Sequence, residues 1–164
     1  MDNITWSEYR DLCLGSGHYC IGASLGMALL RFTSFEVGLV QGAFFSFSAV
    51  SWGLITNKAF QTVCPDLAKR VEDRDPNLSV AVNIAVATNF YALAILTTTY
   101  VVSQGFSFFR GKKVSYGELV KLSIVDSAAF FCWVHVDYTA LRGSGEFLLA
   151  KLLIHFTKKK DEKD

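Results

Sequence analysis

The chain has 164 residues and a net charge of +1 at neutral pH, and 51% of its residues are hydrophobic. Its length fits one domain. The near-zero net charge lacks the basic footprint of a nucleic-acid-binding protein, so we expect no nucleic acid among its partners. A soluble domain can also reach this hydrophobic fraction, so the distribution of charge has to decide the class of protein.

Charged residues are distributed unevenly along the chain. No Asp, Glu, Lys or Arg occurs in residues 12–30, 37–57 or 76–109. Surface helices of soluble proteins carry a charged or polar face, whereas a helix of around 20 apolar residues crosses the hydrocarbon core of a bilayer. The sequence therefore predicts an all-α fold, a polytopic membrane helical bundle that forms a single membrane domain over residues 1–164.

The expected organisation has four transmembrane helices, three well defined by hydropathy and a fourth that is marginal. They are followed by a C-terminal amphipathic helix and a charged tail over residues 146–164. The first residues lack a positively charged n-region, so we expect no cleaved secretory signal. The approximate spans are residues 12–30, 37–57, 80–102 and 122–141, and a polar connector covers residues 58–77.

The first span, residues 12–30, is rich in glycine. Gly15, Gly22 and Gly26 fall on one side of a helical wheel, and the last two form a GxxxG pattern. Such a face allows a neighbouring backbone to approach closely. The short polar stretch after this span predicts a helical hairpin with the second span.

The second span, residues 37–57, carries a longer stripe of small residues. The stripe recurs at helical spacing over the whole span, and bulky apolar residues occupy the other faces. This pattern is typical of a helix that packs on protein along one face. The predicted packing residues are Gly38, Gly42, Ser46, Ala49 and Gly53.

The polar connector predicts a short helix that begins at Pro65, because proline favours the first helical position. The charged residues that follow it are interpreted as a solvated face.

The third span, residues 80–102, lies within the charge-free run 76–109 and also has a small or hydroxyl-bearing stripe. This stripe, more than the length of the run, suggests that it is the central packing helix of the bundle. Asn83 and Asn89 are expected to make interhelical hydrogen bonds, with Asp126 as the first candidate partner. The stripe consists of Ala81, Ala85, Thr88 and Ala92, and Thr99 extends it.

The fourth span, residues 122–141, contains three ionisable side chains, Asp126, His135 and Asp137. Its apolar residues contribute roughly −3 to −4 kcal/mol to insertion and a central Asp costs about +3 kcal/mol, so partner helices are needed to hold it in the membrane. The two aspartates share a helical face. An ionisable group inside a span is a candidate proton or cation ligand, and the alternative is a carboxylate paired within a complex.

No cofactor is predicted from a motif, and no metal site is predicted. His18 and His135 are expected at similar depth in the bilayer, which a bis-histidine haem b would require, but structural histidines remain the simpler interpretation. The four cysteines form no CxxC pair. No nucleophile has a base placed near it by a motif, so an enzyme is not favoured, although an enzyme of lipid chemistry stays open.

The small-residue faces favour a non-catalytic accessory, assembly or structural subunit. Such a subunit would pack laterally in a larger membrane protein complex or in a homo-oligomer, with lipid and other transmembrane subunits or further copies of itself as partners. The alternative is a small transporter or channel that uses Asp126, and the lesser alternative is a haem-binding redox subunit. Both termini are expected on the cytoplasmic or matrix side, in a bacterial inner, mitochondrial inner or endoplasmic reticulum membrane.

Overall fold

A computed structural model describes residues 4–72 and 76–139, which fold into α-helices joined by short connections. The predicted all-α architecture is confirmed for these residues. The predicted C-terminal amphipathic helix and charged tail lie outside them. The elements are α1 (Trp6–Leu29), α2 (Phe35–Val63), α3 (Pro65–Glu72), α4 (Pro76–Arg110) and α5 (Tyr116–Thr139).

Three of the described helices are long and apolar enough to cross a membrane. They are α1, α2 and the Ile84–Arg110 part of α4. This finding supports a multi-pass membrane protein. The helix that contains most of the fourth predicted span is α5. It carries Glu118, Lys121 and Asp126, and its insertion in the membrane stays a prediction.

Local sequence explains where the first hairpin begins and turns. The Thr5 side chain caps α1 in a capping box with Glu8, and the Ser34 hydroxyl accepts a hydrogen bond from the Val37 amide at the start of α2. Between the two helices Arg31 has a φ of +63°, a left-handed conformation that ends α1. The expected connection between the first two spans is therefore a tight turn with its own cap.

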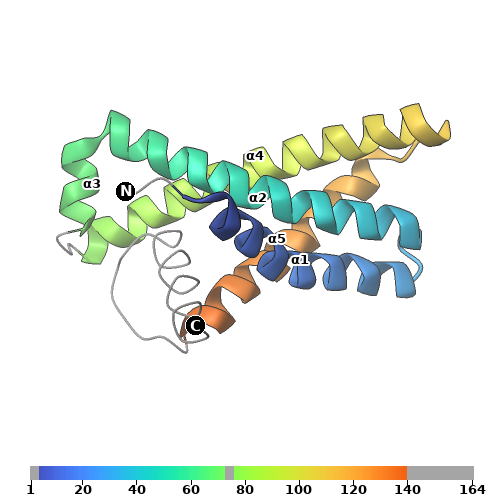
Figure 1. The fold of residues 1–164 in the computed structure, drawn as a ribbon, viewed down its shortest axis with the longest axis horizontal. Coiled ribbons are helices and arrows are strands. Elements are labelled where there is room, and N and C mark those ends of the chain that lie inside the picture. Colours follow the sequence, from blue (N-terminus) through green and yellow to red (C-terminus); the bar gives the residue numbers. More distant parts are fainter. Residues whose placement is uncertain (1–3, 73–75, 140–164) are drawn as a thin grey trace.

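The helices are arranged around α2 (Figure 1). α1 lies antiparallel beside α2, α4 crosses α2, α5 passes beneath the hairpin, and α3 links the far ends of α2 and α4. α2 contacts all the other described helices, and 50% of its most apolar stretch is buried, against 22% in α4. The expectation that residues 76–109 form the central helix is therefore wrong, because the glycine-rich α2 occupies that position.

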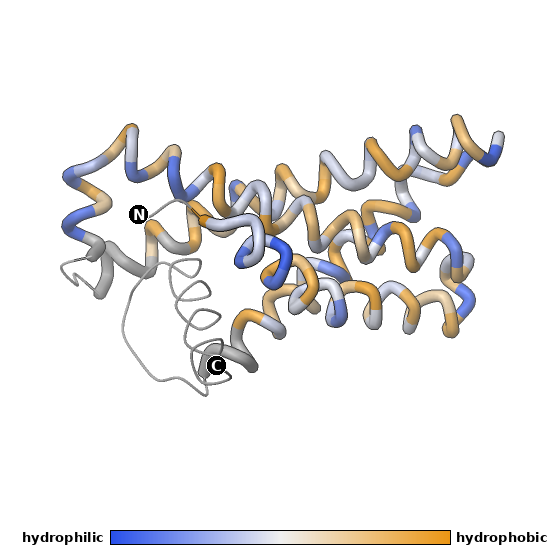
Figure 2. Tube along the Cα trace, in the orientation of Figure 1, coloured by the Kyte–Doolittle hydropathy of each residue, from blue (hydrophilic) through white to orange (hydrophobic). Residues whose placement is uncertain are grey.

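Two apolar cores lie one above the other along the bundle. The first contains Phe45, Phe90, Phe130 and Trp133 among others, and the second is formed by Val37, Val102, Phe106, Val114, Leu119 and Leu122. Hydrophilic residues collect at α3, at the opposite end of the bundle and at the start of α1, whereas the remaining stretches of the helices are largely apolar (Figure 2). Polar groups buried among these apolar residues cost free energy unless they form hydrogen bonds, so their partners have to be identified.

Candidate functional site

The predicted packing residues of α2 are all buried. A Cβ atom on Gly42 would lie 2.7 Å from the Cα atom of Ile21, so the backbones of α1 and α2 approach as closely as glycine permits. Next to this contact the Ser46 hydroxyl is 2.5 Å from that of Ser16 and 2.9 Å from the Cys13 carbonyl oxygen. The whole stripe, which consists of Gly38, Gly42, Ser46, Ala49 and Gly53, thus faces the interior.

The predicted glycine face of α1 lies elsewhere. Gly22 is exposed, Gly15 and Gly26 are half-buried, and a Cβ atom on Gly22 or Gly26 would meet nothing within 4 Å. α1 instead contacts its neighbours through a second stripe of small residues at a regular spacing of four. The spacing of this stripe is visible in the sequence, but the stripe contains no glycine, so the GxxxG pattern points to a different face of the helix. Its members are Ser16, Cys20, Ser24 and Ala28.

The predicted stripe of α4 faces outward over its first four members, whereas Thr99, which extends it, is buried. Ala81, Ala85, Thr88 and Ala92 are all exposed, and no other described helix covers them. Asn89 is also exposed and donates to the Ala85 carbonyl oxygen at 3.0 Å, so it makes no bond to Asp126, and the Asn83 side chain lies outside the described part. α4 buries a different set of residues, which includes Phe90, Ala94, Thr98, Val102 and Phe106.

Asp126 is completely buried where α1 meets α5. The Ser24 hydroxyl donates to its Oδ1 atom at 2.7 Å, and the Cys20 thiol lies 3.6 Å from its backbone carbonyl oxygen. The Oδ2 atom has no hydrogen-bond partner among the described residues. A charged carboxylate enclosed in this way is costly unless a positive charge or further donors compensate it.

A polar layer of buried side chains surrounds this carboxyl group. Gln41 donates from Nε2 to the Ser123 hydroxyl at 2.7 Å, which joins α2 to α5 one turn before Asp126. On every helix of the layer these residues lie between members of the first core and members of the second. We define the polar layer as Ser24, Gln41, Thr98, Thr99, Ser123 and Asp126, each no more than 4% exposed.

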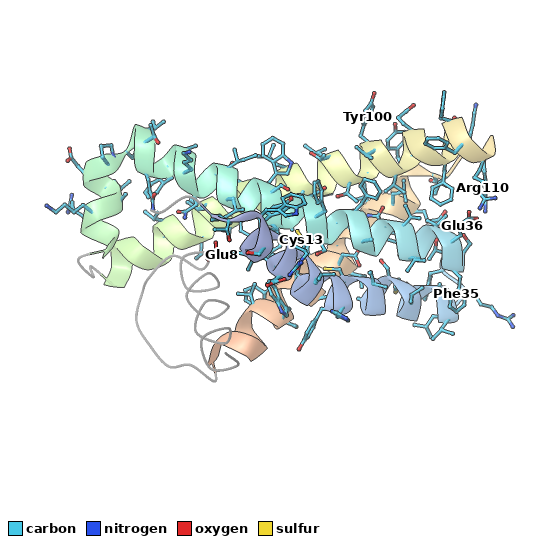
Figure 3. All side chains as sticks on the ribbon, viewed as in Figure 1. Glu8, Cys13, Phe35, Glu36, Tyr100 and Arg110 are labelled. Atoms are coloured by element: carbon cyan, nitrogen blue, oxygen red, sulfur yellow. The ribbon has the colours of Figure 1, made fainter. Side chains whose placement is uncertain are left out.

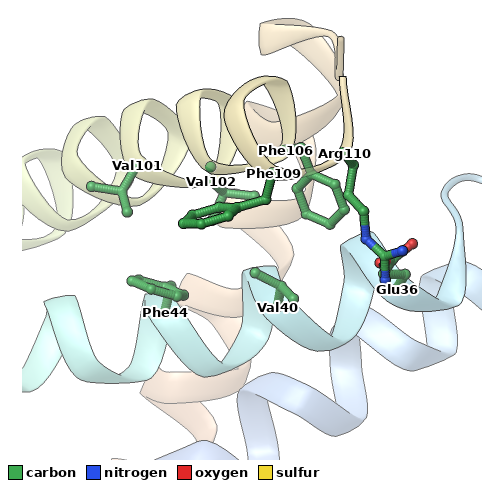
Figure 4. A pocket seen from close by; sticks show the side chains of 9 residues that line it. Glu36, Val40, Phe44, Val101, Val102, Phe106, Phe109 and Arg110 are labelled. Carbon is green, nitrogen blue, oxygen red and sulfur yellow. The ribbon is translucent and has the colours of Figure 1, made fainter. Parts of the chain in front are cut away.

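An apolar groove of about 270 Å³ opens between α2 and α4 at the far end of the bundle. Val40, Val102 and Phe106 form part of its wall, and the Arg110 guanidinium meets the Glu36 carboxylate at 2.6 Å beside it (Figure 4). Figure 3 shows the same two charged side chains at the end of the molecule. Glu36 is the carboxylate in the lining of this groove, and it is held in the ion pair with Arg110.

The predicted haem ligands are not brought together by any described contact. His18 is exposed on α1 with Nδ1 2.6 Å from the Leu14 carbonyl oxygen, and the side chains of His135 and Asp137 lie outside the described part. No group of three or more potential metal ligands among His, Cys, Asp and Glu occurs in residues 4–72 and 76–139 where side chains are described. The pairing of His18 with His135 stays a prediction.

Comparisons of this chain with protein-family models, with curated proteins and with solved structures found no match.

Proposed function

We propose that this chain is a non-catalytic subunit that associates laterally within a membrane, in a larger complex or with further copies of itself. The observation that carries the proposal is the exposed small-residue face of α4. We call this the α4 face and define it by Ala81, Ala85, Thr88 and Ala92.

Several helices of the chain carry small-residue faces. The stripes that contain Ser24 on α1 and Gly42 on α2 are buried, whereas the α4 face and the Gly22 side of α1 are exposed. The stripe on α2 packs closely on α1, whereas the α4 face has no described helix against it. In a bilayer, lipid tails are as apolar as helix side chains, so association depends on close packing and hydrogen bonds. The alanines of the α4 face would allow a second helix to approach closely, and the Thr88 hydroxyl could form a hydrogen bond with it.

Substitution on the α4 face tests this proposal. We expect Ala85→Leu and Ala92→Leu to keep the fold and to weaken recovery of the partner, or of the oligomer, by about tenfold or more, as overpacking does. The chain is purified from native membrane in mild detergent, and copurifying proteins are identified by mass spectrometry. Ala43→Leu is the matched control, because Ala43 is exposed on α2 away from this face.

The subunit proposal fails if the wild-type chain runs as a lone monomer and nothing copurifies with it. It fails equally if the Ala43→Leu control loses the partner as fully as the two α4 variants do.

A second candidate function is ion or proton transport, and the observation that favours it is the buried carboxyl group of Asp126. Ionisable groups inside membrane bundles often mark substrate pathways. We expect Asp126→Asn to abolish flux in liposomes that contain the purified chain, and full flux in that variant would reject transport through this residue.

A further inference from the structure

The polar layer contains buried oxygen atoms whose hydrogen-bonding capacity is not used by the other described residues. Four oxygen atoms in it are buried and lack a partner among the described residues. Gln41 Oε1 is an acceptor only, because it is an amide oxygen. Asp126 Oδ2 is an acceptor only as long as the carboxyl group is ionised. The other two are the Thr98 and Thr99 hydroxyl oxygens on α4.

These residues come from every helix that encloses the centre of the bundle. The Ser24–Asp126 bond joins α1 to α5, and the Gln41–Ser123 bond joins α2 to α5. Gly38 packs on the backbone of Ser24 one turn from Gln41, so the two bonded pairs are neighbours. Thr98 on α4 lies at the same level, between Ala94 of the first core and Val102 of the second.

Within residues 4–72 and 76–139, no described basic side chain is paired with Asp126. The ion pairs in the described part of the chain are Arg10–Asp11 and Arg110–Glu36, both exposed at their side chains. Lys121 lies on α5 but is exposed. Among the described residues, none supplies the positive charge that would offset a buried carboxylate at this position.

We propose that the polar layer binds one monovalent cation, a proton or Na⁺, on Asp126. Its ligands are all oxygens, which hard cations prefer over nitrogen or sulfur. A proton on Oδ2 would turn that oxygen into a donor toward an acceptor such as Gln41 Oε1. Na⁺ would instead draw on the carboxylate, amide and hydroxyl oxygens together.

Among the residues that the structure describes, few other ionisable groups face the layer. Cys20 on α1 contacts the Asp126 backbone, and Tyr91 on α4 packs against Phe130, one turn beyond Asp126 on α5. α2 contributes the neutral Gln41, and Glu118 on α5 is bonded to Thr33 at 2.6 Å, two turns away. A dependence of stability on pH or on Na⁺ that arises in this layer is therefore assigned to the carboxyl group of Asp126.

Binding at the layer does not require a partner subunit, nor movement of the cation across the membrane. A cation held permanently by Asp126 would stabilise the fold, and a cation that exchanges would serve transport. If the experiments below show no cation binding, the subunit proposal is unaffected, because that proposal is tested by copurification.

The first experiment measures the melting temperature of the full chain in detergent. Na⁺ is titrated against choline at constant ionic strength, with K⁺ in parallel, and a second series varies pH without Na⁺. If Na⁺ is the ligand, the melting temperature should rise by about 3–5 °C for each tenfold increase in Na⁺ above its dissociation constant. If a proton is the ligand, Na⁺ has no effect and the melting temperature falls as pH rises.

Asp126→Asn keeps the shape of the side chain and removes its charge, so it should lose either response. Glu118→Gln removes a carboxylate from the same helix and should keep the response. Equal behaviour of wild type and Asp126→Asn in both titrations would overturn the proposal.

A second measurement uses the wild-type chain alone, in case the asparagine variant does not fold. An apolar carbodiimide reacts with protonated carboxyl groups, and mass spectrometry locates the adduct. A proton site predicts labelling of Asp126 that declines at alkaline pH, and a Na⁺ site predicts protection by Na⁺ but not by K⁺. Absence of labelling together with unresponsive melting would also reject the proposal.

Discussion

Gly38 of α2 packs directly on the backbone of Ser24 of α1. A Cβ atom at Gly38 would lie 2.8 Å from the Ser24 carbonyl oxygen, closer than real Cβ atoms come to such an atom. The same Ser24 bonds to Asp126, so the spacing of the α1–α2 hairpin and the position of the polar layer depend on one contact.

Gly38→Ala should therefore destabilise the chain, because α1 would have to move away from α2. We expect a loss of about 1–3 kcal/mol in the free energy of unfolding, measured by SDS titration from mixed micelles. Gly22→Ala is the matched control, since its new methyl group meets nothing within 4 Å and alanine favours the helix by up to about 1 kcal/mol. Equal stability of the two variants would contradict the close contact.

Ser24→Ala should destabilise the fold through Asp126, whose Oδ1 atom would lose its donor. Leaving a buried acceptor unsatisfied costs about 1–3 kcal/mol in the free energy of unfolding. Ser127→Ala serves as the control, because the Ser127 hydroxyl donates only to the Ser123 carbonyl oxygen of its own helix at 2.7 Å. If both variants unfold alike in SDS titration, the bond between α1 and α5 contributes nothing.

Trp52 and Thr97 provide a hydrogen bond between α2 and α4, from the indole Nε1 to the hydroxyl oxygen at 2.9 Å. A double-mutant cycle with Trp52→Phe and Thr97→Val should give a coupling energy of about 0.6 kcal/mol, the typical value between membrane helices. Strict additivity of the two substitutions would show that the bond is absent in detergent.

The Arg110–Glu36 ion pair should contribute little to stability, since its side chains are 66% and 47% exposed. Glu36→Gln is expected to lower the free energy of unfolding by less than about 1 kcal/mol, and this loss should shrink as salt is added. A larger loss that is insensitive to salt would mean that the pair is shielded from water and seals the groove.

The sequence predicted the helices better than the way in which their faces are used. Charge-free runs located α1, α2 and α4 because each of these helices has a stretch long and apolar enough to cross a membrane, and Pro65 begins α3 as expected. On α2 the small residues recur without a break over the whole span, and the expected face is the buried one. Periodicity identifies a smooth face but not which neighbour covers it.

The polar layer was only partly predictable. Asp126 stood out because a charge inside an apolar segment is rare, but Gln41 and Ser24 looked like ordinary polar residues of their spans. What singles them out is their level in the bundle, between two apolar cores, which depends on how far each helix is shifted along its neighbours. The axial shift between two helices is set by tertiary contacts such as that of Gly38 on Ser24, and it cannot be predicted from the sequence of one helix alone.

The length of α4 bears on where a partner must stand. Its 35 residues extend about 52 Å, against roughly 30 Å of hydrocarbon, and even a tilt of 40° leaves about 40 Å along the membrane normal. The exposed Phe108 and Phe109 and the charged Arg110 suit an interface at one end, so the excess length projects at the other, where α3 lies. If the chain is inserted in this way, Ala81 would stand in the headgroup region or in water, and Ala92 would lie among acyl chains. A helix that follows this face must emerge from the bilayer with it, and a partner cut at the membrane surface would cover only half of the face.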